Sequence, residues 1–299
     1  MPAYASPEAF RRAVTDRLRA LAAPKGRWPL PDMQRQFAYD RLLARLYELD
    51  DGWIVKGATA LLARGIAVRH TIDIDLYRVI RQRDAERDLR AALHRPAEDW
   101  FQFTAGVATP VADGVGGVRV PIDARIGAAS WARFHVDVVG DGVRMTGSPE
   151  PVASLIPLTV PGLPSVGYQA YPIVDHIADK VCAILERRGA GRRPSTRFKD
   201  LVDLVVLTGH AQVSVDAQRA ALVSEARRRG IGLPAAFAVP DVSLWDRGYA
   251  AEARRATGFE ARTLTDALAL VRPFIDPLLA GSARGRWRPV VLEWGDLGG

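Results

Sequence analysis

The sequence predicts an α/β fold with a mixed sheet in its N-terminal half and a mainly helical C-terminal half. Before about residue 150, apolar residues recur both at helical spacing and in alternation, whereas after it they recur almost only at helical spacing. Five prolines between Ser148 and Val166 indicate an extended connector. We therefore expect two domains, residues 1–150 and 151–299, which suits a chain of 299 residues.

The N-terminal half is expected to begin with two helices and then to mix strands and helices. The expected helices are Pro7–Ala22, Met33–Leu49, Thr59–Arg64 and Arg81–Leu93. The β-type runs are Trp53–Val55, Thr71–Leu76, Trp100–Val107, Gly117–Ile126 and Arg133–Val139. In the C-terminal half, helical spacing covers residues 172–187, 196–207, 215–229, 244–255 and 264–279.

Composition excludes several classes of protein. With 48% hydrophobic and 25% charged residues, the chain is neither disordered nor fibrous. No apolar run approaches the roughly 18 residues of a membrane span, and charges interrupt the first 21 residues where a signal peptide is apolar. We expect a cytoplasmic protein with no membrane partner. The single cysteine, Cys182, excludes an intrachain disulfide and is expected in the core, and the histidines lack zinc-site spacing.

The net charge of +7 favours an anionic partner such as a nucleic acid or a nucleotide. Only four of the 41 basic residues are lysine, namely Lys25, Lys56, Lys180 and Lys199. A lysine kept where arginine is the usual cation is a candidate for a compact point charge on a phosphate or a reacting oxygen.

The first candidate motif is Lys56-Gly57-Ala58, which follows a short strand and begins a helix. Small residues at such a turn let a phosphate approach backbone N–H groups, and the lysine adds a full charge. The alternative is a plain strand-to-helix turn.

The second candidate is Asp73-Ile74-Asp75 in an alternating run. Residues two apart on a strand share a face, so both carboxylates can bind a divalent cation, while Ile72, Ile74 and Leu76 take the other face. Asp137 lies in another β-type run and completes a three-carboxylate set of the kind used in two-metal nucleotidyl transfer. The alternative for Asp137 is an ion pair with Arg69 or Arg133.

The third candidate lies in the helical half. One expected helix face carries Lys180, Ala183, Ile184 and Arg187, and Asp200 and Asp203 lie one turn apart on the next helix. The alternative is a pair of solvated ion-pair faces. Two arginine-rich stretches, residues 227–229 and 284–288 with Trp287, are further candidates for RNA contact by charge and stacking, or else a helix end and a tail.

Together these motifs resemble the AbiEii/AbiGii family of toxin nucleotidyltransferases, including its MenT-type mycobacterial members, within the polymerase-β-like nucleotidyltransferase superfamily. The resemblance covers about residues 53–207 and depends on Lys-Gly plus a small residue, Thr-x-Asp-x-Asp, Lys-x-x-Ala-x-x-x-Arg and Asp-x-x-Asp-Leu. The residue after Lys-Gly is Ala58 here, where the family usually has Gly or Ser, so a side-chain phosphate contact is not expected at that position.

The resemblance implies a toxin of a type IV-like toxin–antitoxin pair that uses Mg²⁺ and an NTP to transfer nucleotides. MenT-type relatives modify the 3′ acceptor end of tRNA, which blocks translation and growth. The implied site comprises catalytic Asp73, Asp75, Lys180 and Asp203, metal-binding Asp73, Asp75 and Asp137, and nucleotide-binding Lys56, Gly57, Ala58, Arg187 and Asp200. Lys180 and Asp203 would come from the C-terminal lobe and complete the cleft.

The resemblance also implies a cognate antitoxin from the adjacent gene and a monomeric toxin. Thr71 takes the position at which some MenT-type relatives carry a phosphorylated Ser or Thr, so it is a candidate phosphorylation site; the alternative is a residue chosen for β-propensity. Two rival functions remain open: a nucleotidyltransferase that modifies a small molecule or a protein, and an RNA-binding module without catalysis.

Overall fold

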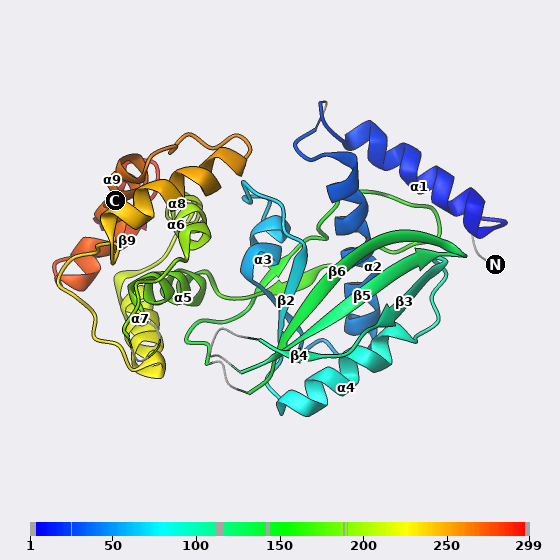
Figure 1. Ribbon diagram of the computed structural model, residues 1–299, viewed down its shortest axis with the longest axis horizontal. Helices are drawn as coiled ribbons and strands as arrows, with labels where there is room; N and C mark the ends of the chain where they lie inside the picture. Colours follow the sequence, from blue (N-terminus) through cyan, green and yellow to red (C-terminus); the bar gives the residue numbers. More distant parts are fainter. Residues whose placement is uncertain are drawn as a thin grey trace. The chain divides into compact units, whose positions relative to one another are not determined.

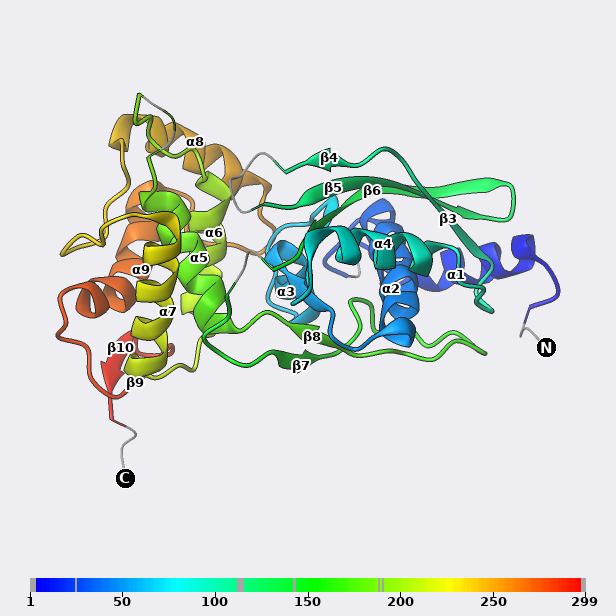
Figure 2. The same ribbon diagram turned by 90° about the horizontal axis from the view of Figure 1, so that it is seen from below.

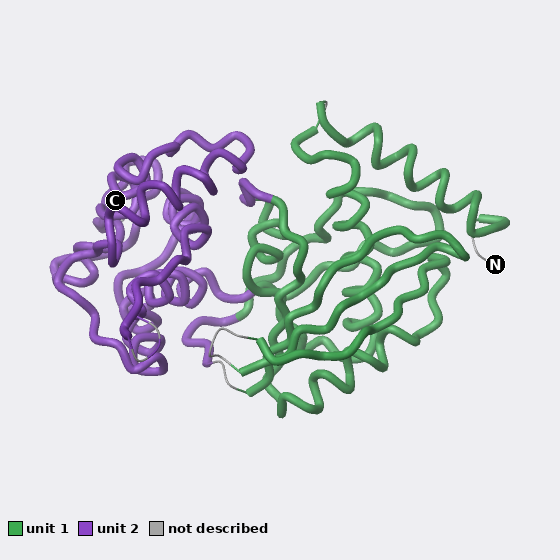
Figure 3. The backbone as a smooth tube through the Cα atoms, in the orientation of Figure 1, with its two compact units in different colours: residues 1–65, 70–143, 149–170 green, residues 66–69, 144–148, 171–299 purple. Residues whose placement is uncertain are grey.

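A computed structural model describes residues 4–24, 26–111, 116–141, 144–187, 189 and 191–296. The chain forms two compact units (Figure 3). Unit 1 contains residues 1–65, 70–143 and 149–170, and unit 2 contains residues 66–69, 144–148 and 171–299. Two short segments thus leave the N-terminal half of the sequence and belong to the unit formed by its C-terminal half.

Unit 1 is a mixed sheet with helices, as the sequence predicts (Figure 1). Its helices are α1 (Pro7–Leu21), α2 (Leu30–Leu49), α3 (Gly57–Ala63) and α4 (Gln82–Leu93). Its strands are β1 (Ile54–Lys56), β2 (Asp73–Tyr77), β3 (Phe101–Ala105), β4 (Thr109–Pro110), β5 (Val118–Ile126), β6 (Ala129–Val139), β7 (Glu150–Val152) and β8 (Tyr168–Ala170). The strand order is β3-β5-β6-β2-β1-β8-β7, with β4 paired to β5, and the β2–β6 and β1–β8 pairs are parallel.

Helices α1, α2 and α4 cover one face of this sheet (Figure 2). Helix α1 begins where the Ser6 hydroxyl accepts from the Ala9 N–H, and it buries Phe10 against Phe101 of β3. From α2, Tyr39 packs edge-to-face on Phe134 of β6, with 4.8 Å between the ring centroids. Burial of each such side chain contributes roughly 1.5–3 kcal/mol. The apolar side of the strands is therefore fixed in the core, which leaves their polar side as the other face.

Two strands here were not expected: β7 lies within the proline-rich connector, and β8 follows the connector directly. Strand β7 lies at the sheet edge and pairs with β8, with Pro151 opposite Gln169. An edge strand accommodates proline because one side of the strand needs no hydrogen-bond donor. The extended conformation was thus predicted correctly, whereas its incorporation in the sheet was not.

Unit 2 is mainly helical, as predicted. It contains α5 (Ile173–Leu185), α6 (Phe198–Thr208), α7 (Val215–Arg229), α8 (Val242–Arg255), α9 (Leu264–Leu279) and a hairpin of β9 (Arg286–Arg288) and β10 (Glu293–Gly295). The hairpin overturns the idea that Trp287 stacks on RNA. Its side chain is 2% exposed, its indole N–H donates to the Thr208 carbonyl, and it packs edge-to-face on Phe274.

Candidate functional site

Four charged residues form one row across the polar face of the unit 1 sheet. Lys56 of β1 lies opposite Asp75 of β2, Asp75 lies beside Asp137 of β6, and Asp137 lies opposite Arg119 of β5. Residues paired between neighbouring strands point to the same face, so the two carboxylates lie side by side with a cation at each end of the row. Asp73 and His135 form the next row of the same face. The sheet thus brings the two motif aspartates and Asp137 together, as the sequence predicts.

Asp73 is held from several sides. The Thr71 hydroxyl accepts from the Asp73 N–H at 3.2 Å, and the buried Thr59 hydroxyl donates to the Asp73 carbonyl at 3.3 Å. Its carboxylate lies 3.2 Å from His135 Nδ1 and 3.5 Å from Arg119 Nη2. The side chain is 26% exposed, so a ligand can reach a carboxylate whose backbone is fixed.

Asp137 forms a bidentate ion pair with Arg119, with N–O distances of 2.8 and 2.7 Å. This pair and the nearby carboxylates raise the pKa of the Arg119 guanidinium above its usual range. The alternative partners of Asp137, Arg69 and Arg133, are wrong: Arg69 binds Asp203 in unit 2, and Arg133 faces Asp123 at 3.9 Å. Arg119 was not singled out from the sequence, because it meets Asp137 only through a β5–β6 register that shifts between Ala124 and Arg125.

The Lys56-Gly57-Ala58 motif lies at the junction of β1 and α3. Gly57 adopts a left-handed backbone with φ of +56°, which favours glycine. Lys56 is half-buried, and Ala58 is buried at 6% exposure. Helix α3 has seven residues, so its dipole adds little, and Lys56 carries most of the positive charge that a phosphate would meet here.

The carboxylates of this face have the chemistry that a magnesium ion needs. Mg²⁺ prefers oxygen ligands and is commonly bound by one or two carboxylates plus substrate phosphates. Asp73 and Asp75 provide two carboxylates on one face of β2, whereas both oxygens of Asp137 are engaged by Arg119. In the part of the chain that the structure describes, no group of three or more His, Cys, Asp or Glu side chains is arranged to hold a metal ion. The carboxylates therefore suit a Mg²⁺ ion whose remaining ligands include oxygens of a substrate phosphate.

Unit 2 brings together Lys180, Asp200 and Asp203 from α5 and α6. Lys180 Nζ donates to Asp200 at 3.0 Å and to Asp203 at 2.7 Å. Arg69 makes a bidentate pair with Asp203, and Arg197 binds Asp200 at 2.6 Å. The alternative of solvated ion pairs is wrong, because Lys180 and Asp200 are each 6% exposed and Asp203 is 1% exposed.

The charges of this cluster hold one another in the ionised state. Burial alone would lower the pKa of Lys180, but Asp200 and Asp203 raise it above its usual value. Burial alone would raise the pKa of Asp203, but Arg69 and Lys180 hold it well below its usual range. Lys180 is therefore a fixed positive charge and not a proton acceptor at neutral pH.

Three other sequence expectations are corrected or confirmed. Arg187 does not share a helix face with Lys180, because α5 ends at Leu185 and Glu186 is extended. The exposed Arg187 instead donates to the Arg192 and Pro240 carbonyls.

Ile72 does not share the apolar face with Ile74 and Leu76, because β2 begins at Asp73 and Ile72 is 51% exposed. Cys182 is fully buried as expected, and burial raises its thiol pKa to about 12.

No helix among the described residues is long and apolar enough to cross a membrane. The arginines at the end of α7 are largely engaged, since Arg228 and Arg229 both bind Glu225. This favours the helix-end interpretation of residues 227–229 over an open RNA-binding cluster.

Known proteins resemble this chain in sequence pattern and in fold. The family model described as nucleotidyl transferase AbiEii toxin, type IV toxin–antitoxin system, matches residues 41–288. MenT4, a nucleotidyltransferase toxin from Mycobacterium tuberculosis H37Rv, has a similar structure, with a TM-score of 0.52 and 16% identity over 92% of this chain and 99% of that chain. JHP933 from Helicobacter pylori is similar at 15% identity over 82% of this chain and 92% of that chain, with a TM-score of 0.44. No curated protein matches this chain at a significant level. The likeness to MenT4 confirms the predicted nucleotidyltransferase fold.

Proposed function

Because this chain belongs to the AbiEii family of nucleotidyltransferase toxins of type IV toxin–antitoxin systems, we propose that it transfers nucleotides from an NTP to the 3′ acceptor end of tRNA. The transfer depends on Mg²⁺ and stops growth by blocking translation. The observation that carries the proposal is the convergence of Lys56, Asp73, Asp75 and Asp137 on one sheet face. Family membership also implies a cognate antitoxin as a partner.

On this face the carboxylates and the cations have different roles. Asp73 and Asp75 would hold Mg²⁺, which when bound supplies Lewis-acid charge to the phosphates of the NTP. Lys56, at the start of α3, contacts the triphosphate as a point charge. Arg119 pairs with Asp137 and lies 3.5 Å from Asp73, so its positive charge limits the repulsion between the carboxylates.

The proposed step is a simple displacement at the α-phosphorus. The acceptor hydroxyl oxygen bonds to this phosphorus, and the bond from the phosphorus to the bridging oxygen of pyrophosphate breaks. Pyrophosphate leaves with the electron pair, and the hydroxyl proton passes to water. The catalytic work consists of positioning and charge, because this reaction needs little covalent help from the protein.

A nucleic-acid acceptor is favoured over a small molecule by the charge of the protein. The chain carries a net charge of +7, and the polar sheet face carries two exposed arginines, Arg125 and Arg133. A small acceptor would gain little from such a field, whereas a polyanion gains affinity from each contact with a phosphate.

The proposal is tested with purified protein, total tRNA and each labelled NTP in turn, followed by a denaturing gel. We expect one or more nucleotides to be added to tRNA in the presence of Mg²⁺ and no addition after EDTA treatment. Transfer that occurs equally well in EDTA would overturn the metal dependence. Label found on protein, or on a small molecule instead of tRNA, would overturn the acceptor.

A further inference from the structure

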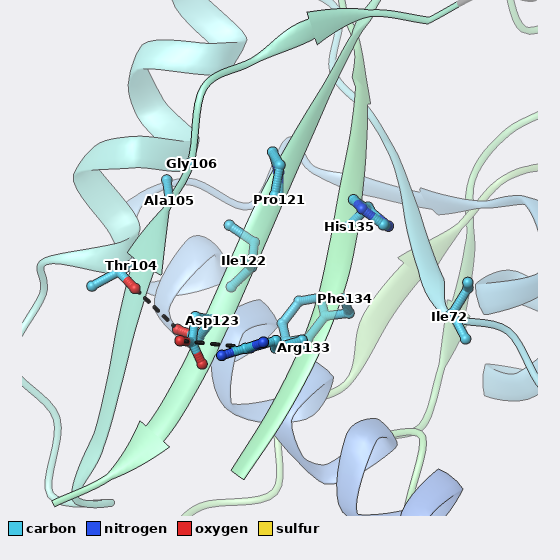
Figure 4. Close-up of a pocket in the computed structure, with 10 residues that line it drawn as sticks. All are labelled: Ile72, Thr104, Ala105, Gly106, Pro121, Ile122, Asp123, Arg133, Phe134 and His135. Carbon is cyan, nitrogen blue, oxygen red and sulfur yellow. Dashed lines mark hydrogen bonds and ion pairs between the residues drawn. The ribbon is translucent and has the colours of Figure 1, made fainter. Parts of the chain in front are cut away.

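A cavity of about 470 Å³ lies on the polar face of unit 1, next to the row that holds Asp73 (Figure 4). Its walls come from β3, β5 and β6 and from the segments that flank β2 and β3. Figure 4 shows Thr104, Asp123 and Arg133 at one end and Pro121 and His135 at the other. His135 both lines the cavity and lies 3.2 Å from the Asp73 carboxylate, so the cavity adjoins the proposed catalytic face.

The strand order places this cavity on a defined side of the two motif aspartates. Lys56 lies on β1, which pairs with one edge of β2. The cavity lies over β6, β5 and β3, which follow from the other edge of β2. Asp73 and Asp75 therefore lie between the lysine that would contact the triphosphate and the cavity.

In-line phosphoryl transfer requires the same arrangement of its two substrates. The attacking oxygen and the departing pyrophosphate lie on opposite sides of the phosphorus. With the triphosphate near Lys56 and the cation at Asp73 and Asp75, the attacking hydroxyl approaches from the side of β6. We propose that the cavity receives the terminal nucleotide of the RNA acceptor, an inference that rests on the function proposed above.

The chemistry of the walls suits a nucleobase that carries amino or imino groups. The Asp123 Oδ1 atom is buried, and it accepts no hydrogen bond from any residue that the structure describes. Its Oδ2 atom lies 3.5 Å from Arg125 and 3.9 Å from Arg133. The Asp123 side chain lines the cavity and is 24% exposed, so its carboxylate can accept from a base N–H.

The remaining walls suit the flat base and its phosphate. Pro121 and His135 are neighbours across β5 and β6, and they present an exposed pyrrolidine ring and a half-buried imidazole ring on the polar face. The side chain of Arg133 is 78% exposed, so it can reach the phosphate of the terminal nucleotide. A volume of about 470 Å³ lies within the range of sites for small ligands, which suits one nucleotide and not a duplex.

The test separates binding of the acceptor from binding of the NTP. Transfer rates are measured for the wild type and Asp123→Asn while the tRNA concentration and the NTP concentration are varied in separate series. We expect the KM for tRNA to rise about tenfold, since the amide accepts more weakly than the carboxylate and presents an N–H₂ group to the base, and the KM for NTP to stay within twofold. Asp16→Asn, at an exposed position on α1, is the matched control and keeps both constants.

A second variant, Gly106→Leu, tests the proposal independently if Asp123→Asn does not fold. Gly106 is exposed and has an ordinary backbone, so Gly106→Leu fills the cavity without entering the core. This variant is also expected to raise the KM for tRNA and not that for NTP. An unchanged KM for tRNA in both folded variants would overturn the proposal, and a rise confined to the NTP would assign the cavity to the donor base.

One further measurement distinguishes failure of this inference from failure of the proposed function. Equilibrium binding of a short single-stranded RNA with a free 3′ end is measured on the wild type and on Gly106→Leu. If the wild type transfers nothing to RNA, the proposed function fails, but weaker RNA binding by Gly106→Leu would still support the cavity. Equal RNA binding by both proteins would overturn it.

Discussion

Gly57 and Asp75 are packed so closely that a Cβ atom at residue 57 would lie 1.9 Å from Asp75 Oδ2. The glycine also has a φ of +56°, which an L side chain adopts at a cost. Gly57 directly follows Lys56, which is paired with Asp75 in the β1–β2 ladder. This pairing brings the Gly57 backbone next to the Asp75 side chain. The close approach of the Asp75 carboxylate therefore requires glycine at this position of the Lys-Gly motif, whether or not a phosphate binds there.

Gly57→Ala is expected to lower nucleotide transfer about 100-fold, because the new methyl group displaces the Asp75 carboxylate. The backbone strain costs on the order of 1–3 kcal/mol of stability. Gly65→Ala is the matched control, since Gly65 has a φ of +71° with no atom within 4 Å of its Cβ position. The control should lose stability and keep its transfer rate. Equal rates in both variants would refute the role of the close approach.

Thr71 offers a direct way to silence the same face. Its hydroxyl accepts from the Asp73 N–H, so a phosphate on Thr71 would place a charge of roughly −2 beside the two aspartates. We predict that the antitoxin's neutralisation of the toxin involves phosphorylation here. The toxin is coexpressed with the product of the adjacent gene, and its intact mass and phosphopeptides are measured together with transfer activity.

One added phosphate on Thr71 with loss of transfer would support this switch. A stable complex without added mass, or full neutralisation of Thr71→Val by the antitoxin, would rule it out. Thr71 itself precedes β2 and is not a strand residue, so its position depends on the hydrogen bond to Asp73 and not on strand alternation.

Lys180→Arg is predicted to lose most transfer activity although the charge is kept. Lys180 reaches Asp200 and Asp203 from a buried position, where a planar guanidinium cannot reproduce both contacts. Lys199→Arg, at an exposed position of α6, is the control and should keep full activity. Lys25, the other lysine outside every motif, lies outside the described residues. Full activity of Lys180→Arg would show that a guanidinium can replace the lysine and would refute the need for a compact ammonium group at this position.

The same cluster should also dominate the stability of unit 2. Lys180→Met leaves Asp200 and Asp203 buried with less compensation, and we expect a loss of about 3–5 kcal/mol. Urea unfolding of this variant beside Lys180→Arg separates a loss of folding from a loss of chemistry. A urea unfolding curve of Lys180→Met equal to that of the wild type would contradict the stabilising role of the ion-pair network.

Asp40 provides a pH-dependent measure of unit 1 stability. It accepts from the Leu155 and Ile156 N–H groups and from the Tyr168 hydroxyl, yet burial raises its pKa from 3.8 to about 6. Because the folded state favours the protonated form, this stability is complete below pH 3.8 and is lost as the pH rises through 6. The free energy of unfolding falls by about 3 kcal/mol over this pH range.

Urea unfolding of the wild type and Asp40→Asn at pH 4, 5, 6 and 7 checks this prediction, because the other titrating groups are common to both proteins. The wild type should lose stability relative to the variant across this range. Parallel pH dependences of the two proteins would show that Asp40 does not titrate as expected.

Much of this molecule could be predicted from the sequence because the signals are local. Alternation at residues 71–76 predicted that Asp73 and Asp75 share a face, and the structure confirms it. The Lys56-Gly57 turn after a short strand was also local, since a glycine between a β-type run and a helix permits few alternatives.

The parts that could not be predicted depend on contacts between distant segments. Nothing near Asp137 in the sequence indicates Arg119, which meets it only through the β5–β6 register. Arg69 joins Asp203 across 134 positions of sequence, because residues 66–69 belong to unit 2. The prediction that Arg187 shares a helix face with Lys180 was wrong for a related reason. The helical spacing of the sequence continues past Leu185, whereas helix α5 ends there.

The initial rate of nucleotide transfer by folded Asp75→Ala tests most directly whether the carboxylates of β2 form the catalytic centre. Removing a carboxylate that lies beside Asp73 and Asp137 relieves repulsion, so the melting temperature should not fall. We predict a rate lower by about three orders of magnitude or more, with growth inhibition abolished. A wild-type rate in a folded Asp75→Ala protein would contradict the account.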